Sequence, residues 1–344
     1  MKPQDLTLQP KTDPLEIYRY RDGLYAVDLL TAALTELDLF TWLSKNPSDK
    51  AAICQNFNIV ERPADVMLTL FTAMDYVQNR AGVFHVTETA SEHLVAGSPW
   101  FMGPYYAALK ERPVCKDYLT VLRTGKPANW GSYKDEKAWA KAMEGDDFAN
   151  RFTAAMDCRG VYLAQGMAKK LDLSGNHRLL DVAGGSGIYA CSLVAHHPHL
   201  GATVLEKPPV DEIARNAIAK RGYSEKVSVI AGDMFKEAWP EGFDLHLISN
   251  VLHDWEEPMV KQLLAKSFHA LQPGGTLIIH DAIVNREKTG PLPVASYSAL
   301  LMNITEGKCY SVAEYEQYLK EANFTEPKFF QSVADRSFMT AHRT

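Results

Sequence analysis

The stretch Leu179-Leu180-Asp181-Val182-Ala183-Gly184-Gly185-Ser186-Gly187 decides the fold of this chain. Its apolar residues predict a buried strand that ends on a carboxylate, its glycines predict a tight turn, and a helix is expected to begin near Ile188. Because Gly184, Gly185 and Gly187 carry no Cβ atom, their backbone can approach a ligand and adopt positive φ angles. The start of the following helix turns N–H groups toward the same place. This arrangement indicates a site for a nucleoside cofactor.

Two cofactor classes compete for this turn. The run Gly185-Ser186-Gly187-Ile188-Tyr189-Ala190 matches the G-x-G-x-x-G/A pattern of dinucleotide sites. Asp181 discriminates between the classes, because a carboxylate at the strand end would repel a pyrophosphate and attract the cationic amino-acid end of S-adenosylmethionine. We therefore expect S-adenosylmethionine at this turn, held by Asp181, Gly184, Gly185 and Gly187.

Two further acids follow predicted strands. Val204-Leu205-Glu206 places a carboxylate where ribose hydroxyls would lie, although both cofactor classes use such an acid. After the strand Val227–Ile230, the run Gly232-Asp233-Met234-Phe235 supplies an acid and a thioether that could bracket an adenine. Each carboxylate alone could be an ordinary helix cap or turn residue. Three acid-bearing strand ends together favour S-adenosylmethionine.

The composition is that of an ordinary globular protein. The chain has 344 residues, of which 46% are hydrophobic and 23% charged, enough for a large core and two domains. Its net charge of −6 argues against broad binding to nucleic acid or acidic membranes. Five cysteines without a CxxC pair favour a reducing compartment. Without a signal peptide or a long apolar run, we expect a cytoplasmic protein with no membrane partner.

From about Arg159 to the end, strands alternate with helices, which predicts an α/β fold with a doubly wound, Rossmann-like parallel sheet. Pro258 is expected in the first turn of a helix that Asp254 would cap. Pro273-Gly274-Gly275 is expected to end that helix. The clearest strands are Leu179–Val182, Thr203–Leu205, Val227–Ile230, Leu245–Ile248 and Thr276–Ile279.

The first hundred residues follow a different order, which predicts a winged helix. An apolar helical stretch from Leu29 to Leu43 precedes two helices near Asp49–Asn56 and Pro63–Val77 and a hairpin at Val83–Val86. The helix Pro63–Val77 would be the recognition helix, yet it holds two aspartates and no lysine or arginine. Since phosphate contacts need positive charge, DNA binding is disfavoured. We expect an apolar scaffold for self-association, and hence a homodimer.

His253 is the candidate general base. It lies in Ser249-Asn250-Val251-Leu252-His253-Asp254-Trp255, just past the strand Leu245–Ile248, on the sheet edge where open α/β folds bind ligands. A lone histidine is often only a structural hydrogen bonder, but a place beside the glycine turn favours proton transfer. The run His196-His197-Pro198-His199 enters a strand at the opposite edge. There we expect a solvated loop, and no metal.

These motifs resemble the S-adenosylmethionine-dependent O-methyltransferases of the caffeic acid and acetylserotonin type, which bacteria use on aromatic secondary metabolites. The resemblance covers nearly the whole chain and includes the glycine turn, Gly232–Phe235, His253-Asp254-Trp255 and Leu271-Gln272-Pro273-Gly274-Gly275. It implies a class I methyltransferase domain over residues 106–344. An α-helical winged-helix dimerisation domain would precede it over residues 1–105.

The resemblance also implies roles for single residues. His253 would be the general base, and Glu206 would bind ribose. Asp233 and Met234 would contact adenine. The acceptor ring would lie between Phe152 and Met156.

Four positions depart from the family pattern. Ala183 replaces a glycine of the cofactor turn. Asp281 stands at the first of two positions where a glutamate is expected beside the histidine, one methylene shorter, and could still orient His253. Cys309 replaces the second glutamate, and Glu306 could take part instead. Ser249 replaces a lysine near the adenine.

We therefore expect an enzyme that moves a methyl group from S-adenosylmethionine to a hydroxyl of a small aromatic acceptor, with His253 and Asp281 as the catalytic pair. The candidate acceptor residues indicate a flat, mostly apolar ligand; they are Phe152, Met156, Leu300, Met302 and Asn303. Three alternatives stay open. They are methylation of an aromatic carbon, decarboxylation or hydroxylation with the cofactor retained, and a non-enzymatic regulator.

Overall fold

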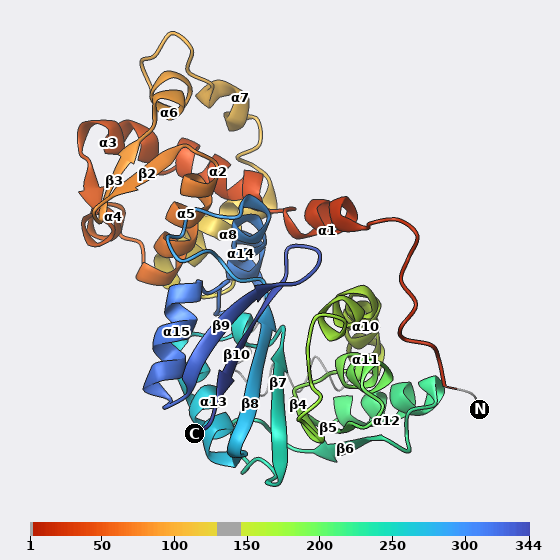
Figure 1. Cartoon of the computed structure of the whole chain (residues 1–344). Coiled ribbons are helices and arrows are strands. Elements are labelled where there is room, and N and C mark those ends of the chain that lie inside the picture. The colour runs from red at the N-terminus through yellow and green to blue at the C-terminus, as the bar shows by residue number, and fades with distance from the viewer. Residues whose placement is uncertain (1–2, 129–145) are drawn as a thin grey trace.

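Within the residues that the computed structural model describes, 3–128 and 146–344, seven strands form the main sheet in the order β6-β5-β4-β7-β8-β10-β9 (Figure 1). β4 to β8 pair in parallel, whereas β10 is antiparallel to both β8 and β9. The predicted α/β fold with a doubly wound sheet is confirmed. The strands are β4 (Arg178–Val182), β5 (Gly201–Glu206), β6 (Val227–Ala231), β7 (Phe243–Ser249), β8 (Leu271–Asp281), β9 (Thr325–Gln331) and β10 (Ser337–His342).

Helices cover both faces of this sheet (Figure 1). One face carries α10 (Asp146–Ala168), α11 (Ile188–His196) and α12 (Val210–Arg221), and the other carries α13 (Glu257–Ala270) and α15 (Val312–Glu321). Successive strand side chains point to opposite faces and so feed both cores. Leu179 packs with residues of α10 and α11, whereas Leu180 packs with residues of α13 and α15. β4 is therefore apolar on both sides, as a central parallel strand must be.

The strand order reverses at β4, with β5 and β6 on one side and β7 and β8 on the other. Parallel strands end at the same edge of a sheet, and open α/β sheets bind ligands where the order reverses. Asp181 in β4, Glu206 at the end of β5 and Ser249 at the end of β7 therefore lie along one edge.

Three predicted boundaries are wrong. The helix predicted over Pro63–Val77 is α5 (Glu61–Ala73), which includes Arg62, and Val77 belongs to β2 (Val77–Arg80). Leu29–Leu43 is not one helical stretch but α2 (Ala26–Thr35) and α3 (Leu39–Lys45), separated where Asp38 adopts a positive φ of 50°. β8 begins at Leu271, which pairs with Phe243, and the register shifts before Thr276 pairs with Leu245. Pro273-Gly274-Gly275 therefore lies inside an irregular stretch of strand, because Leu271 already pairs with β7.

The N-terminal helices have a core of their own. After α1 (Leu15–Asp22), α2 and α3 come β1 (Ser48–Asp49), α4 (Lys50–Phe57), α5 (Glu61–Ala73), β2 (Val77–Arg80), β3 (Val83–Val86), α6 (Glu88–His93), α7 (Gly103–Ala107) and α8 (Pro113–Thr124). The three short strands form a sheet in the order β1-β3-β2. The same core takes in residues of α8 and, from far along the chain, Ala295, Ala299 and Met302 of α14 (Leu292–Ile304). α14 thus joins the N-terminal core to the α/β part.

Among the described residues, no helix combines the length and the apolar character needed to cross a membrane.

Candidate active site

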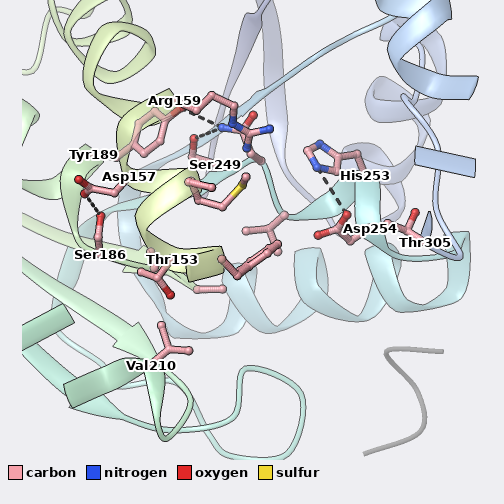
Figure 2. A pocket seen from close by; sticks show the side chains of 18 of the residues that line it. Thr153, Asp157, Arg159, Ser186, Tyr189, Val210, Ser249, His253, Asp254 and Thr305 are labelled. Carbon is pink, nitrogen blue, oxygen red and sulfur yellow. Dashed lines mark hydrogen bonds and ion pairs between the residues drawn. The ribbon is translucent and has the colours of Figure 1, made fainter. Parts of the chain in front are cut away.

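One cavity of about 1320 Å³ lies at the carboxyl edge of the sheet (Figure 2). It exceeds the roughly 300–1,000 Å³ of a usual small-molecule site, so it has room for two ligands. We call one side the strand half; it is formed by residues that end or follow β4 to β7, namely Asp181, Gly184, Gly185, Glu206, Asp233, Met234 and Ser249. We call the other side the helix half; it comes from α1, α10, α14 and the 3₁₀ turn η1 (Leu252–Asp254), and includes Tyr18, Phe152, Met156, Arg159, His253, Tyr297 and Leu300.

The glycine turn after β4 forms part of the wall of the strand half and leaves space beside Gly185. Gly184 packs so tightly that a Cβ atom there would lie 2.6 Å from Asp181 Oδ2, whereas a Cβ at Gly185 would meet nothing within 4 Å. The Gly185 N–H donates to Glu206 Oε2 at 2.9 Å and so ties the turn to the end of β5. Gly187, which was predicted in the cofactor site, is not among the residues that line the cavity. It caps α11 with a φ of 73°, and a Cβ there would meet Ile218 of α12 at 2.9 Å.

Asp181 is a buried carboxylate in need of a partner. It is 1% exposed, and neither carboxylate oxygen has a hydrogen-bond partner of ordinary geometry among the described residues. Burial raises the pKa of Asp181 to about 7. A buried charge is stable only when it is paired, so this side chain fits a cationic ligand group and opposes an anionic one.

The other two acids of the strand half are held by backbone groups. Glu206 accepts from Gly185 N and from Lys207 N at 2.8 Å, and burial raises its pKa. Asp233 accepts from Phe235 N at 2.9 Å and lies 3.4 Å from Lys207 Nζ. Partial burial opposes ionisation of Asp233, but these partners outweigh it and lower its pKa. Both carboxylates can accept further bonds from hydroxyl or amine donors of a ligand.

His253 lies in the helix half, in η1, and is 3% exposed. Its Nδ1 is hydrogen-bonded to Asp281 Oδ1. Burial alone would raise the pKa of Asp281, but the charge of His253 and its hydrogen bond lower it. An ionised carboxylate only accepts, so Nδ1 carries the proton, and Nε2 of the neutral ring is left to accept one. Asp281 therefore orients His253 from the end of β8, outside the cavity wall.

Asp254 provides a second carboxylate beside the histidine. Its Oδ1 lies 3.6 Å from His253 Nε2 (Figure 2), and it lines the cavity. The prediction that Asp254 caps the next helix is wrong, because Glu256 is the N-cap residue of α13. Burial opposes protonation of His253, but Asp281 and Asp254 outweigh it and hold the pKa of His253 above its usual value. Burial also raises the pKa of Asp254.

Neither Cys309 nor Glu306 takes the place of the second glutamate that the family pattern expects beside His253. Cys309 is buried against α14, and its N–H donates to Ser298 Oγ at 3.1 Å. Glu306 pairs with Lys126 at 3.1 Å and does not line the cavity. Asp254, the last residue of η1, takes the place beside the ring.

The acceptor residues predicted on α14 need correction. Phe152 and Met156 of α10 and Leu300 of α14 line the cavity, but Met302 and Asn303 do not. On α14 the cavity face runs through Tyr297, Leu300, Leu301 and Ile304, the spacing of one helical side. Met302 points instead into the N-terminal core and is fully buried there. Asn303 is also buried, off the cavity face.

The structure adds residues that no motif had indicated. Arg159 and Asp157 line the cavity from α10, and Tyr297 lines it from α14. Arg159 could have been found from helical spacing, since it follows Phe152 by two turns and Met156 by one. Tyr18 within α1 and Tyr25, the N-cap residue of α2, line the cavity as well and carry no sequence signal.

Ser249 and the histidine run complete the predicted set. Ser249 lines the cavity and is hydrogen-bonded to His280 Nδ1 and Asn250 Nδ2, both at 3.0 Å. In the histidine run, His196, His197 and His199 each contact a backbone carbonyl oxygen. Within residues 3–128 and 146–344, no group of three or more His, Cys, Asp or Glu side chains is arranged to hold a metal ion.

Comparison with known proteins assigns the family. Residues 120–325 match the O-methyltransferase domain. The 3-hydroxy-5-methyl-1-naphthoate 3-O-methyltransferase of Streptomyces sahachiroi is 33% identical over 307 residues, 88% of this chain and 87% of that protein. The L-tyrosine C(3)-methyltransferase of Streptomyces lavendulae is 29% identical over 322 residues, 90% of this chain and 86% of that protein.

A solved structure agrees with this result. The O-methyltransferase family 2 protein from Planctomyces limnophilus, crystallised with apigenin, superposes with a TM-score of 0.89 at 28% identity and full coverage of both chains. The fold, the sequence match and the relatives lead to one assignment: the chain belongs to the O-methyltransferase family.

Proposed function

We propose that this enzyme transfers the methyl group of S-adenosylmethionine to a phenolic hydroxyl of a small aromatic acceptor. The observation that carries the proposal is that one cavity joins two buried groups. One is the carboxylate of Asp181, which has no hydrogen-bond partner of ordinary geometry among the described residues, and the other is His253, whose Nε2 is available as a base. The first feature suits a cationic donor and the second suits an acidic hydroxyl.

The strand half fits S-adenosylmethionine. Asp181 would pair with the ammonium group, Glu206 would accept from ribose hydroxyls, and Asp233 with Met234 would hold the adenine. Gly184 and Gly185 would let the backbone approach the ligand, and Ser249 lines the same wall. When bound, S-adenosylmethionine supplies an electrophilic sulfonium methyl group. The carboxylate oxygens of Asp181, which lack a hydrogen-bond partner of ordinary geometry among the described residues, support this cofactor. The pyrophosphate of a dinucleotide would repel this carboxylate and leave it without a cationic partner.

His253 would take the proton of the acceptor hydroxyl. With ordinary pKa values of about 10 for the phenol and about 6.5 for imidazole, complete transfer in the ground state would cost roughly 5 kcal/mol. The raised pKa of His253 narrows this gap. Asp281 stabilises the imidazolium that forms, and Asp254 adds a second negative group beside it. Phe152, Met156 and Leu300 would hold the ring so that its oxygen stays aligned for attack.

The N-terminal part is proposed to be a winged-helix dimerisation domain over residues 1–105, with the methyltransferase domain over residues 106–344. Large apolar side chains are exposed in this part, among them Ile17, Tyr20, Leu24, Trp100 and Tyr105. Exposed large apolar side chains favour association, so a homodimer is expected, with no role in nucleic-acid binding. Light scattering behind a sizing column would give the mass. A mass of one chain at micromolar concentration would refute the dimer.

The reaction itself is tested by product analysis. Purified enzyme is incubated with S-adenosylmethionine carrying a ¹³C-labelled methyl group and a panel of hydroxyarenes. We expect the label in an aryl methoxy group. Label on a ring carbon would establish C-methylation, the alternative that the tyrosine C(3)-methyltransferase relative keeps open. A product without the label would indicate a decarboxylase or hydroxylase of the same fold.

Two further properties belong to the proposal. The relatives from Streptomyces and the large acceptor cavity support a role in the secondary metabolism of aromatic compounds. A cytoplasmic location is supported by the five cysteines, all of which are free thiols.

A further inference from the structure

Two arginines flank Tyr297 in the helix half, and they differ in one respect. Arg336 lies over the Tyr297 ring, 4.5 Å from its centroid, and donates to Asp22 Oδ2 at 2.8 Å. Arg159 donates from Nη1 to the Tyr297 hydroxyl at 2.9 Å. Among the described residues, no carboxylate lies within ion-pair distance of Arg159, and its Nε is buried without a hydrogen-bond partner. One guanidinium is therefore paired and the other is not.

The unpaired arginine lines the cavity beside the base. Arg159 follows Phe152 and Met156 on the inner side of α10, and Figure 2 shows it at the same pocket as His253. Tyr297 links the two: its hydroxyl accepts from Arg159, and its ring centroid lies 5.7 Å from that of His253. One ligand in this part of the cavity can thus contact both Arg159 and His253.

Within residues 3–128 and 146–344, no side chain supplies the missing anion. The carboxylates that line this part of the cavity already have cationic partners: Asp22 binds Arg336, Asp157 binds Arg221, and Asp254 lies beside His253. A buried cation without a counter-ion is costly, and a guanidinium pairs best with a planar, two-oxygen anion. The counter-ion of Arg159 is therefore expected to come from a ligand.

We propose that Arg159 binds a carboxylate on the acceptor, so that the substrate class is hydroxyarene carboxylates whose acid group lies on the same ring as the reacting hydroxyl or on a neighbouring one. This inference rests on the proposed methyl transfer and narrows its substrate. Arg159 acts as a specificity residue: it holds the acid group while His253 faces the hydroxyl. It also neutralises the acceptor carboxylate, which would otherwise oppose ionisation of the hydroxyl beside it.

The test compares two acceptors that differ only in the acid group, 3-hydroxy-2-naphthoate and 2-naphthol. We expect wild-type kcat/KM to favour the naphthoate by at least about 30-fold, the effect of one desolvated charge pair. Arg159→Met should bring this ratio close to one, mainly through the naphthoate, and Arg159→Lys should restore part of it. A wild-type ratio near one, or an equal loss on both acceptors in Arg159→Met, would overturn the proposal.

Two controls distinguish an acceptor site at Arg159 from a cofactor site and from a packing role. The carboxylate of S-adenosylmethionine is the rival anion, so the affinity of the cofactor is measured by calorimetry in wild type and Arg159→Met. We expect the two affinities to agree within a few-fold, and a loss of more than about ten-fold would assign Arg159 to the cofactor instead. Arg336→Met removes the paired arginine next to the same tyrosine. It is expected to lower the melting temperature without changing the acceptor ratio.

Failure of the methyl transfer can be told apart from failure of this inference. If wild type methylates neither acceptor, the proposed reaction is refuted for this class. Calorimetry with the protein loaded with S-adenosylhomocysteine then still tests the anion site. Binding of 3-hydroxy-2-naphthoate that is lost in Arg159→Met would support the site, and equal binding by both proteins would refute it.

Discussion

In the strand half of the cavity, each wall residue lies in a β-strand or follows one by a few residues. The helix half is instead formed by α1, α10, η1 and α14, whose residues are far apart in the sequence, as Tyr18 and Tyr297 are. The strand half carries carboxylates held by backbone N–H groups, as at Glu206 and Asp233. The helix half carries a base, His253, whose pKa is raised by Asp281 at the end of β8 and by Asp254 beside it in η1. The sheet thus builds the part that binds the donor, and long-range packing builds the part that does the chemistry.

The largest expected effect separates these two tasks. His253→Gln removes the proton acceptor, and we expect kcat to fall roughly 10²- to 10⁴-fold, the usual contribution of a general base. S-adenosylmethionine affinity should stay within a few-fold of wild type, because the strand half is untouched. Rapid-quench turnover and calorimetry on the same preparation measure both. Near-normal turnover would remove the base assignment.

The second prediction concerns how His253 is oriented. Asp281→Asn removes the charge that holds Nδ1 protonated, so turnover should fall roughly 10- to 100-fold. Because the raised pKa of His253 depends on Asp281, its loss lowers that pKa. Activity requires the neutral ring, and the acidic limb of the kcat/KM profile should therefore move to lower pH. An unmoved limb would show that Asp281 does not set the state of His253.

The smallest effects distinguish two neighbours on α14. Leu300 lines the cavity and Met302 is buried in the N-terminal core. Leu300→Ala should raise the KM for the acceptor up to about ten-fold, in addition to the loss of stability that truncating a buried leucine causes. Met302→Ala should lower the free energy of unfolding by about 2–5 kcal/mol and leave the acceptor KM unchanged. Denaturant titration and initial-rate kinetics on both variants measure this contrast, and the reverse pattern would contradict it.

The sequence predicted the strand half well because its signals are local. Each acid or turn follows a strand directly in the sequence, and parallel strands end at the same edge of the sheet. Asp181, Gly184 and Glu206 are therefore brought together at that edge. Gly187 lies off the cavity wall and packs against Ile218, a role that the sequence pattern of a turn glycine does not distinguish from ligand contact.

The helix half was harder to predict because its residues meet only in three dimensions. Met302 and Asn303 follow Leu300 in the sequence, but α14 is shared between two cores, so both faces of the helix are apolar and the pattern does not show which one lines the cavity. Asp254 looked like a helix cap because a helix begins soon after it. Only the fold shows that its carboxylate faces His253. The unpaired state of Arg159 is likewise visible only once its neighbours are placed.

The most direct test of the division between the halves is the affinity of S-adenosylmethionine for wild type and Asp181→Asn, measured by calorimetry at about pH 6 and about pH 7.5. The pKa of Asp181 in the protein without ligand is about 7, and a bound cation stabilises its ionised form. At the lower pH, binding must therefore release a proton from Asp181. Wild-type affinity for S-adenosylmethionine should fall several-fold, at most about ten-fold, between the higher and the lower pH. Asp181→Asn should bind roughly 100-fold more weakly at the higher pH, with little pH dependence. The folded protein disfavours ionised Asp181, so its stability falls as the pH rises toward and past 7, and the variant without ligand should melt no lower than wild type there. Equal affinity of the two proteins at both pH values would contradict the account.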